Sequence, residues 1–379
     1  MIQRFALIIY FIIIGISGSL ACTSAIIGAS RNPYGRPLLW KNRDTSATDN
    51  KIEYVEGQNG AHSFVGLFNA SDLKLEEVWM GMNDAGFAIM NTASYNIKDD
   101  NIPEKEMDKE GILMKRALET CITVDDFSKF LDSYPRPMGV EANFGVIDAY
   151  GNGAYFETNN HSYIIFDLKD TPDDVLIRTN YSHSGRPEEG FGFIREANAQ
   201  HLLEPYIQNS TVTAEVLTET VSRAFWHDLF NTDFLNAGQE WLIDQDFIPR
   251  YKSTATIVIE GCKPIMDNDQ PSSSMVQDEY IMWTGLGYPP CAEIVPVKCM
   301  PGGVEDCLRG LEADGHSKMS DIAKARRNEV FPFHKGNGDK YIRTDRLYND
   351  NGTGYIQQLV PQNLETYRIV REKRGEITK

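Results

Sequence analysis

Cys22 stands where a thiol could become the first residue of the mature chain. Arg4 and the apolar run of residues 5–16 have the pattern of a secretory signal peptide, because the run is too short to cross a bilayer as a helix. Ser19-Leu20-Ala21 then fits the small-x-small pattern that signal peptidase needs. Cleavage after Ala21 would leave Cys22 with a free α-amino group within reach of its thiol. Nucleophile and general base would then be one residue.

The same position has a second interpretation. Leu20-Ala21-Cys22 also resembles a bacterial lipobox, in which the cysteine is diacylated and anchors the protein to a membrane. A lipobox usually carries Leu three residues before the cysteine, and here that residue is Ser19. We therefore expect an exported protein, periplasmic or extracellular, with residues 1–21 removed as the signal peptide. The alternative is a membrane-anchored lipoprotein, and a membrane is an expected partner only in that case.

Several segments follow Cys22-Thr23 in an order that can be compared with a known family. They are Leu39-Trp40-Lys41-Asn42-Arg43-Asp44, Gly81-Met82-Asn83-Asp84-Ala85-Gly86-Phe87-Ala88 with Asn91 shortly after it, Val175-Leu176-Ile177-Arg178-Thr179-Asn180, Pro249-Arg250-Tyr251, and Trp283-Thr284-Gly285-Leu286-Gly287-Tyr288-Pro289. Together they resemble the N-terminal nucleophile (Ntn) hydrolases of the choloylglycine hydrolase and penicillin acyltransferase type. The resemblance runs in order from Cys22 to Val297 and leaves the remainder unmatched.

The resemblance implies a role for each of these residues. Cys22 would be the nucleophile through its thiol and the base through its free amine, which Asp44 would hold in place. Asn180 would donate its side-chain amide to the oxyanion, and the backbone N–H near Asn91 would be the second donor. Arg250 would lie near the thiolate and favour its ionised form.

Some of these residues also fit simpler interpretations. Asp44 beside Arg43 fits a surface ion pair. Asn180 fits a turn, and Asn180-Tyr181-Ser182 is formally a glycosylation sequon. Arg250 fits a solvated surface side chain. Lys41 departs from the Arg or Gln that the family usually has, so the resemblance assigns it no role.

Five more cysteines follow in a chain expected to enter an oxidising compartment. Cys121 has the spacing of a buried position on a helix. Cys291, Cys299 and Cys307 recur every eight residues, with no His at ligand spacing nearby. This pattern favours a local disulfide over a zinc site. We expect neither a metal nor an organic cofactor.

Composition narrows the class of protein. The 379 residues are 41 % hydrophobic and 24 % charged, which is typical of a folded soluble chain. The 54 acidic residues outnumber the 37 Lys and Arg, giving a net charge of −17 that repels phosphate backbones. Nucleic acid is therefore excluded as a partner, and a small-molecule amide is expected. The chain is compatible with a homo-oligomer.

The elements that must position the candidate site alternate between strands and helices. The patterns predict a hairpin around the turn at residues 32–35, a helical region at 104–134 broken at Thr123, a hairpin at 143–156, a strand at 163–167, helices at 189–206 and 214–229, and strands at 254–260 and 280–284. Residues 22–379 show no composition break, which predicts one α+β catalytic domain. The resemblance implies an αββα sandwich, with two antiparallel sheets between helical layers.

The resemblance implies an exported cysteine amidase. It would hydrolyse a linear, non-peptide amide through a thioester at Cys22, as bile-salt hydrolases and penicillin V acylases do. One alternative is an acyltransferase that passes the acyl group to an amine. The other is a lipid-anchored surface protein that binds a ligand without catalysis, because an acylated Cys22 has no free base.

Overall fold

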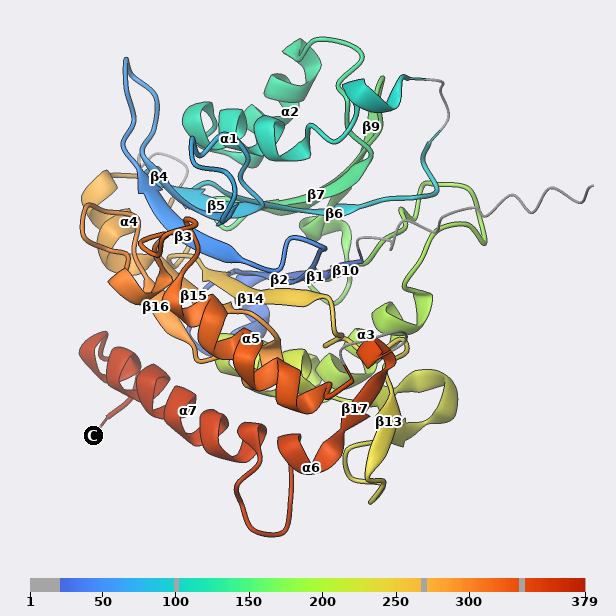
Figure 1. Cartoon of the computed structure of the whole chain (residues 1–379). Coiled ribbons are helices and arrows are strands. Elements are labelled where there is room, and N and C mark those ends of the chain that lie inside the picture. The colour runs from blue at the N-terminus through green and yellow to red at the C-terminus, as the bar shows by residue number, and fades with distance from the viewer. Residues whose placement is uncertain (1–20, 99–101, 267–270, 334–337, 379) are drawn as a thin grey trace, which may run out of the picture.

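The computed structural model describes residues 21–98, 102–266, 271–333 and 338–378. Apart from Ala21, the predicted signal peptide lies outside the described residues. Two antiparallel sheets face each other at the centre of the molecule (Figure 1). Leu39, Ile257 and Met282 of one sheet and Val65, Met82 and Met90 of the other belong to one buried apolar cluster.

The first sheet has the strand order β10-β1-β2-β14-β15-β16. Its strands are β1 (Thr23–Ile27), β2 (Leu38–Asp44), β10 (Val175–Arg178), β14 (Ser253–Glu260), β15 (Ile281–Leu286) and β16 (Val295–Val297). Strands from both ends of the chain thus lie side by side in its middle. This order places β2 between β1 and β14.

The second sheet keeps the order of the sequence, from β3 to β9. Its strands are β3 (Asn50–Val55), β4 (Phe64–Asn69), β5 (Met80–Asn83), β6 (Ala88–Ala93), β7 (Ala142–Ile147), β8 (Gly153–Thr158) and β9 (Tyr163–Asp167). The predicted hairpin at 143–156 is β7 and β8, paired with Ala142 opposite Thr158. The predicted N-terminal hairpin is β1 and β2.

Helices cover the outer face of each sheet (Figure 1). On the second sheet, α1 (Glu110–Thr120) and α2 (Val124–Ser133) bury Leu113 and Phe127 against Phe144. On the first sheet, α3 (Phe193–Gln208) and α7 (Tyr355–Lys373) pack against Trp40 and Trp283. The remaining helices are α4 (Ser273–Glu279), α5 (Lys318–Val330) and α6 (Thr344–Leu347). The α+β class and the αββα sandwich are confirmed.

Two predicted features differ in the structure. The helix expected at 214–229 is confirmed only as far as Arg223, as an irregular helix with a π-helical part at Val216–Thr220 and a 3-10 part at Val221–Arg223, and the short strand β11 (Trp226–His227) follows it. The Ser222 hydroxyl donates to the carbonyl of Leu217, five residues back. This side-chain hydrogen bond competes with the backbone hydrogen bonds of a regular α-helix. The local disulfide expected among Cys291, Cys299 and Cys307 is not formed, because all six cysteines are free thiols. Cys291 is buried in one apolar cluster, and Cys299 is buried in another, against which Cys307 packs.

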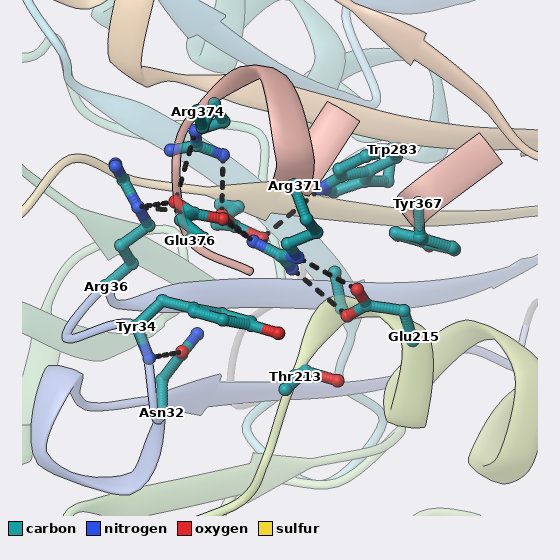
Figure 2. A network of polar contacts seen from close by, with 12 residues as sticks. Asn32, Tyr34, Arg36, Thr213, Glu215, Trp283, Tyr367, Arg371, Arg374 and Glu376 are labelled. Carbon is teal, nitrogen blue, oxygen red and sulfur yellow. Dashed lines mark hydrogen bonds and ion pairs between the residues drawn. The ribbon is translucent and has the colours of Figure 1, made fainter. Parts of the chain in front are cut away.

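The C-terminal helix α7 is fastened by a buried ionic network at the far end of β14 (Figure 2). Both Arg371 terminal nitrogens lie 2.7 Å from Glu260, which is fully buried, and Arg374 lies 2.8 Å from it. Burial would raise the pKa of Glu260, but Arg371, Arg374 and Arg36 together hold it below its usual value. The segment beyond the resemblance thus completes the helical layer. No described helix is long and apolar enough to span a membrane.

Candidate active site

Cys22 directly precedes β1, at the end of the first sheet where β2 also ends. β1 and β2 are antiparallel with Thr23 opposite Asn42, so the next step along each strand brings Cys22 close to the end of β2. The Cys22 Sγ lies 3.9 Å from the backbone oxygen of Asp44. Cys22 is buried, and Ala21 still precedes it. The candidate nucleophile therefore lies beside Asp44 and contacts its backbone.

Asp44 is held by partners on β14 and the turn before it. Ser253 lies directly opposite Asp44 in the sheet, and its hydroxyl donates to Asp44 Oδ1 at 2.5 Å. Arg250 binds Asp44 Oδ2 with Nε at 3.0 Å and a terminal nitrogen at 2.9 Å. The Asp44 side chain is only 1 % exposed. A buried carboxylate with three donors is pre-organised to accept a further hydrogen bond.

The expected surface pair of Asp44 with Arg43 does not form. Neighbouring side chains in a strand point to opposite faces of the sheet. Arg43 instead donates to Asn50 and Asn69 and lies over the Trp79 ring, 4.9 Å from its centre. The simpler interpretation of Asp44 is therefore wrong.

Arg250 joins Asp44 to the residue before Cys22. One of its terminal nitrogens donates to the Ala21 carbonyl at 3.3 Å. Burial would lower the pKa of Arg250, but the carboxylates of Asp44 and Asp244 raise it above its usual value. Arg250 is thus a fixed positive charge beside the Ala21–Cys22 bond and not a freely solvated side chain.

Asn180 reaches the same place from the other neighbour of β1. Ser24 is opposite Arg178, so two more steps along both chains put Asn180 opposite Cys22. The Asn180 amide donates to the Ala93 carbonyl at 2.9 Å, and its oxygen accepts from Arg195. An amide nitrogen has two N–H bonds, so one remains for another acceptor. Asn180 is fully buried, which rules out the glycosylation interpretation.

Arg195, in the first turn of α3, is part of the site although no sequence motif pointed to it. Its guanidinium donates to the Cys22 carbonyl at 2.5 Å, to the Thr23 hydroxyl at 3.0 Å and to the Asn180 side-chain oxygen at 3.0 Å. Burial, together with the nearby charge of Arg250, lowers its pKa to about 10. One signal was available, because a cation in the first turn opposes the helix dipole and needs another reason to be there.

Lys41 and Asn91 lie together on the side that faces the second sheet. The Lys41 ammonium donates to the Asn91 side-chain oxygen and to the Trp79 carbonyl, both at 2.9 Å. Burial lowers the pKa of Lys41 to about 8, although a negative charge on Cys22 acts in the opposite direction. The structure thus ties Asn91 to the site through its side chain. The donor role of the backbone near Asn91 stays a prediction.

Two further residues complete the surroundings. Ser253 was missed because its role depends on lying opposite Asp44 across 209 residues of sequence. Asn42 lies opposite Thr23 and is fully buried, yet neither its amide nitrogen nor its oxygen has a hydrogen-bond partner. Among the described residues, no three His, Cys, Asp or Glu side chains are grouped as metal ligands would be.

Comparison with known proteins gives a family match. The model of a family described as acyl-coenzyme A:6-aminopenicillanic acid acyl-transferase matches residues 31–223, just over half of the chain. No curated protein matches the chain in a sequence search.

Three solved structures share a distant likeness. A Caenorhabditis elegans N-acylethanolamine-hydrolyzing acid amidase ortholog is 13 % identical over 68 % of this chain and 98 % of its own, with a TM-score of 0.42. A conjugated bile acid hydrolase from Clostridium perfringens is 12 % identical over 73 % and 92 %, with a TM-score of 0.43. Penicillin V acylase from Agrobacterium tumefaciens is 9 % identical over 73 % and 86 %, with a TM-score of 0.37.

Proposed function

Because the chain belongs to the acyl-coenzyme A:6-aminopenicillanic acid acyl-transferase family, of the Ntn hydrolase type, whose enzymes act on carbon–nitrogen bonds, we propose that it is an exported cysteine amidase. Its substrate is a linear amide, and the reaction passes through a thioester at Cys22. The observation that carries the proposal is the convergence of Cys22, Asp44, Asn180 and Arg250 at one end of the first sheet.

Export creates the base in this proposal. Removal of residues 1–21 converts the Ala21–Cys22 peptide nitrogen into a free amine at the place that Arg250 contacts through the Ala21 carbonyl. Asp44, on the other side of Arg250, accepts a hydrogen bond from that amine and orients it. The positive charge of Arg250 disfavours protonation of the amine to an ammonium group, which keeps the amine available as a base.

In the proposed reaction, the thiol and the amine of Cys22 carry out each step. The amine takes the proton of the thiol, and the thiolate attacks the carbonyl carbon of the amide to give a tetrahedral oxyanion. The unused N–H of Asn180 donates to that oxyanion. The ammonium gives its proton to the leaving nitrogen as the C–N bond breaks, leaving a thioester and a free amine product. Water, deprotonated by the same amine, hydrolyses the thioester to a carboxylic acid.

Acyl transfer is the second candidate, and the description of the matching family favours it. In that reaction an acceptor amine replaces water in the last step. The acyl-enzyme and the residues that form it are the same. The ratio of acid to new amide, measured with increasing acceptor amine, separates hydrolysis from transfer.

The test begins with the mass of the mature, purified protein. We expect a chain that starts at an unmodified Cys22, hydrolyses at least one N-acyl amide, and gains the mass of the acyl group during turnover. Cys22→Ala should abolish turnover and the adduct, whereas Cys121→Ala, which removes another buried thiol, should keep both. A lipid adduct on Cys22, or full activity of Cys22→Ala, would refute the proposal.

A further inference from the structure

A cavity of about 430 Å³ lies beside the candidate site, in a part of the chain that the family match does not reach. Its walls are β11, the following residues 228–235, β13 (Trp241–Ile243) with residues 244–247, and the start of α3. The side chains used below are Ile194, His227, Phe230, Phe234, Trp241 and Phe247. All but Ile194 come after residue 223, where the match ends.

The residues that line the cavity are close in the chain to residues of the candidate site. Ile194 lines the cavity, and the next residue, Arg195, donates to the Cys22 carbonyl. On the other wall, Phe247 precedes Arg250 by three residues. Asn198, one helical turn after Arg195, donates to the backbone oxygen of Asp246 at 2.9 Å and so holds the two walls together. The start of α3 and residues 244–247 thus line the cavity and also carry or precede the residues that contact Cys22 and Ala21.

Aromatic rings form the inside of the cavity. The His227 ring lies 4.6 Å from Phe230, 6.3 Å from Phe234 and 6.0 Å from Phe247, centre to centre. Phe234 and Phe247 are 5.9 Å apart at an interplanar angle of 71°. Rings arranged edge to face in this way favour another ring between or beside them. The exposed rings of Phe230 and Trp241 extend the apolar surface toward solvent.

One polar atom of a residue that lines the cavity has no hydrogen-bond partner. His227 is 4 % exposed, and its Nδ1 makes no hydrogen bond. Leaving a buried polar atom unpaired costs about 1–3 kcal/mol, which a ligand atom or a water can recover. Asp246 also lines the cavity, and a carboxylate there opposes a negatively charged ligand.

We propose that this cavity holds the acyl half of the substrate, and that this half is an uncharged apolar group with a ring and one hydrogen-bonding atom for His227. The inference rests on the proposed function and adds to it which part of the molecule selects the substrate. The family match cannot supply this residue set, because all of the set but Ile194 lies outside the matched residues.

The experiment compares amides that share one amine, 4-nitroaniline, and differ in the acyl group. The groups are acetyl, dodecanoyl, phenylacetyl, 4-hydroxyphenylacetyl and 4-carboxyphenylacetyl. We expect the highest kcat/KM for 4-hydroxyphenylacetyl, and a carboxyl-bearing analogue at least tenfold slower. A preference for dodecanoyl or 4-carboxyphenylacetyl would overturn the assignment of a neutral ring.

Variants locate the preference in the cavity. Phe234→Ala should lower the ratio of kcat/KM for phenylacetyl over acetyl by roughly tenfold, because one side of the aromatic wall is gone. The matched control is Phe130→Ala, the same change at a partly buried ring on α2, and it should leave the ratio as it is. If Phe234→Ala fails to fold, Trp241→Ala at the exposed rim should lower the same ratio.

A second variant tests the polar atom. His227→Phe keeps a ring but removes Nδ1, so it should abolish the preference for 4-hydroxyphenylacetyl over phenylacetyl. Ratios within twofold of wild type in Phe234→Ala, Trp241→Ala and His227→Phe would overturn the inference. Hydrolysis that still depends on Cys22 in those variants would leave the proposed function standing, whereas hydrolysis that persists in Cys22→Ala would refute the proposed function instead.

Discussion

Asp44→Asn tests the site most directly, because it removes one charge and almost no volume. In the wild type, Ser253 donates to one Asp44 oxygen. Arg250 donates to the other through Nε and holds a terminal nitrogen 2.9 Å from it. The Asn oxygen can accept from Arg250, and the amide nitrogen then faces Ser253, whose hydroxyl can turn to accept. The fold should persist with every polar atom paired.

The expected cost in stability is moderate. Breaking a buried ion pair typically costs about 3–5 kcal/mol. Here Arg250 keeps a neutral acceptor at the altered position and the nearby carboxylate of Asp244, and its side chain is 22 % exposed. Replacing a charged hydrogen bond with a neutral one costs about 1 kcal/mol, and Arg250 makes two contacts with the altered side chain. A loss of about 2 kcal/mol in the free energy of unfolding is therefore expected.

The expected cost in catalysis is much larger. Without the carboxylate, the Cys22 amine loses the charged acceptor that orients it, and positioned acid–base catalysis is worth roughly 100- to 10,000-fold. kcat should fall by at least 100-fold while KM changes little, because Asp44 does not touch the substrate. Urea unfolding gives the stability, and steady-state kinetics on the same preparation give kcat and KM.

Ser253→Ala is the matched control for Asp44→Asn. It removes a hydrogen bond to the same carboxylate but leaves the charge and both Arg250 contacts. We expect it to lose about 1 kcal/mol of stability and less than tenfold in kcat. A folded Asp44→Asn protein with kcat within tenfold of wild type would refute the role of the charge. Equal losses of kcat in the two variants would refute it as well.

Three further results follow from the structure. A mature chain that begins Met-Ala-Cys should fold but show no turnover, because the Cys22 nitrogen is then an amide; activity with that extension confirmed by mass would contradict the α-amine as base. Asn180→Ala should lose roughly 100- to 1,000-fold in kcat and still be alkylated at Cys22 by iodoacetamide, since alkylation forms no oxyanion; loss of labelling would mean a disrupted fold instead. Burial raises the pKa of Glu110, which is 8 % exposed, to about 7, so the folded state binds its proton more tightly than the unfolded chain and stability falls as pH rises from about 4.5 to 7. Glu110→Gln should flatten that slope and gain at most about 3 kcal/mol above pH 7 in urea titrations, and an unchanged slope would show that Glu110 is not the cause.

Local patterns predicted local structure well. The capping box at Thr123 is present, with the Thr123 hydroxyl accepting from the Asp126 N–H and the Asp126 side chain accepting from the Thr123 N–H, because every atom involved lies within four residues. The break between α1 and α2 follows from it. The helix expected at 214–229 is irregular and ends at Arg223, where the Ser222 hydroxyl bonds to Trp40 and Thr256 in contacts that no local pattern records.

The candidate site shows the same division. The order of motifs brought Cys22, Asp44 and Asn180 to attention, and the structure places them together. Arg195 and Ser253 were missed because their importance arises from contacts across 173 and 209 residues. The eight-residue spacing of three cysteines misled, because spacing does not show that Cys291 is buried in a different apolar cluster from Cys299 and Cys307.

The strand order of the first sheet also sets when the protein can begin to work. β2 pairs with β14, and Asp44 is held by Arg250, 206 residues further along the chain. A ribosome must therefore synthesise more than two thirds of the protein before β2 can pair with β14. Strands so far apart in sequence pair slowly, so one edge of β2 stays unpaired until β14 has been made. A truncated product that ends before β14 therefore lacks part of the candidate site. The site can form only after about two thirds of the chain has been made.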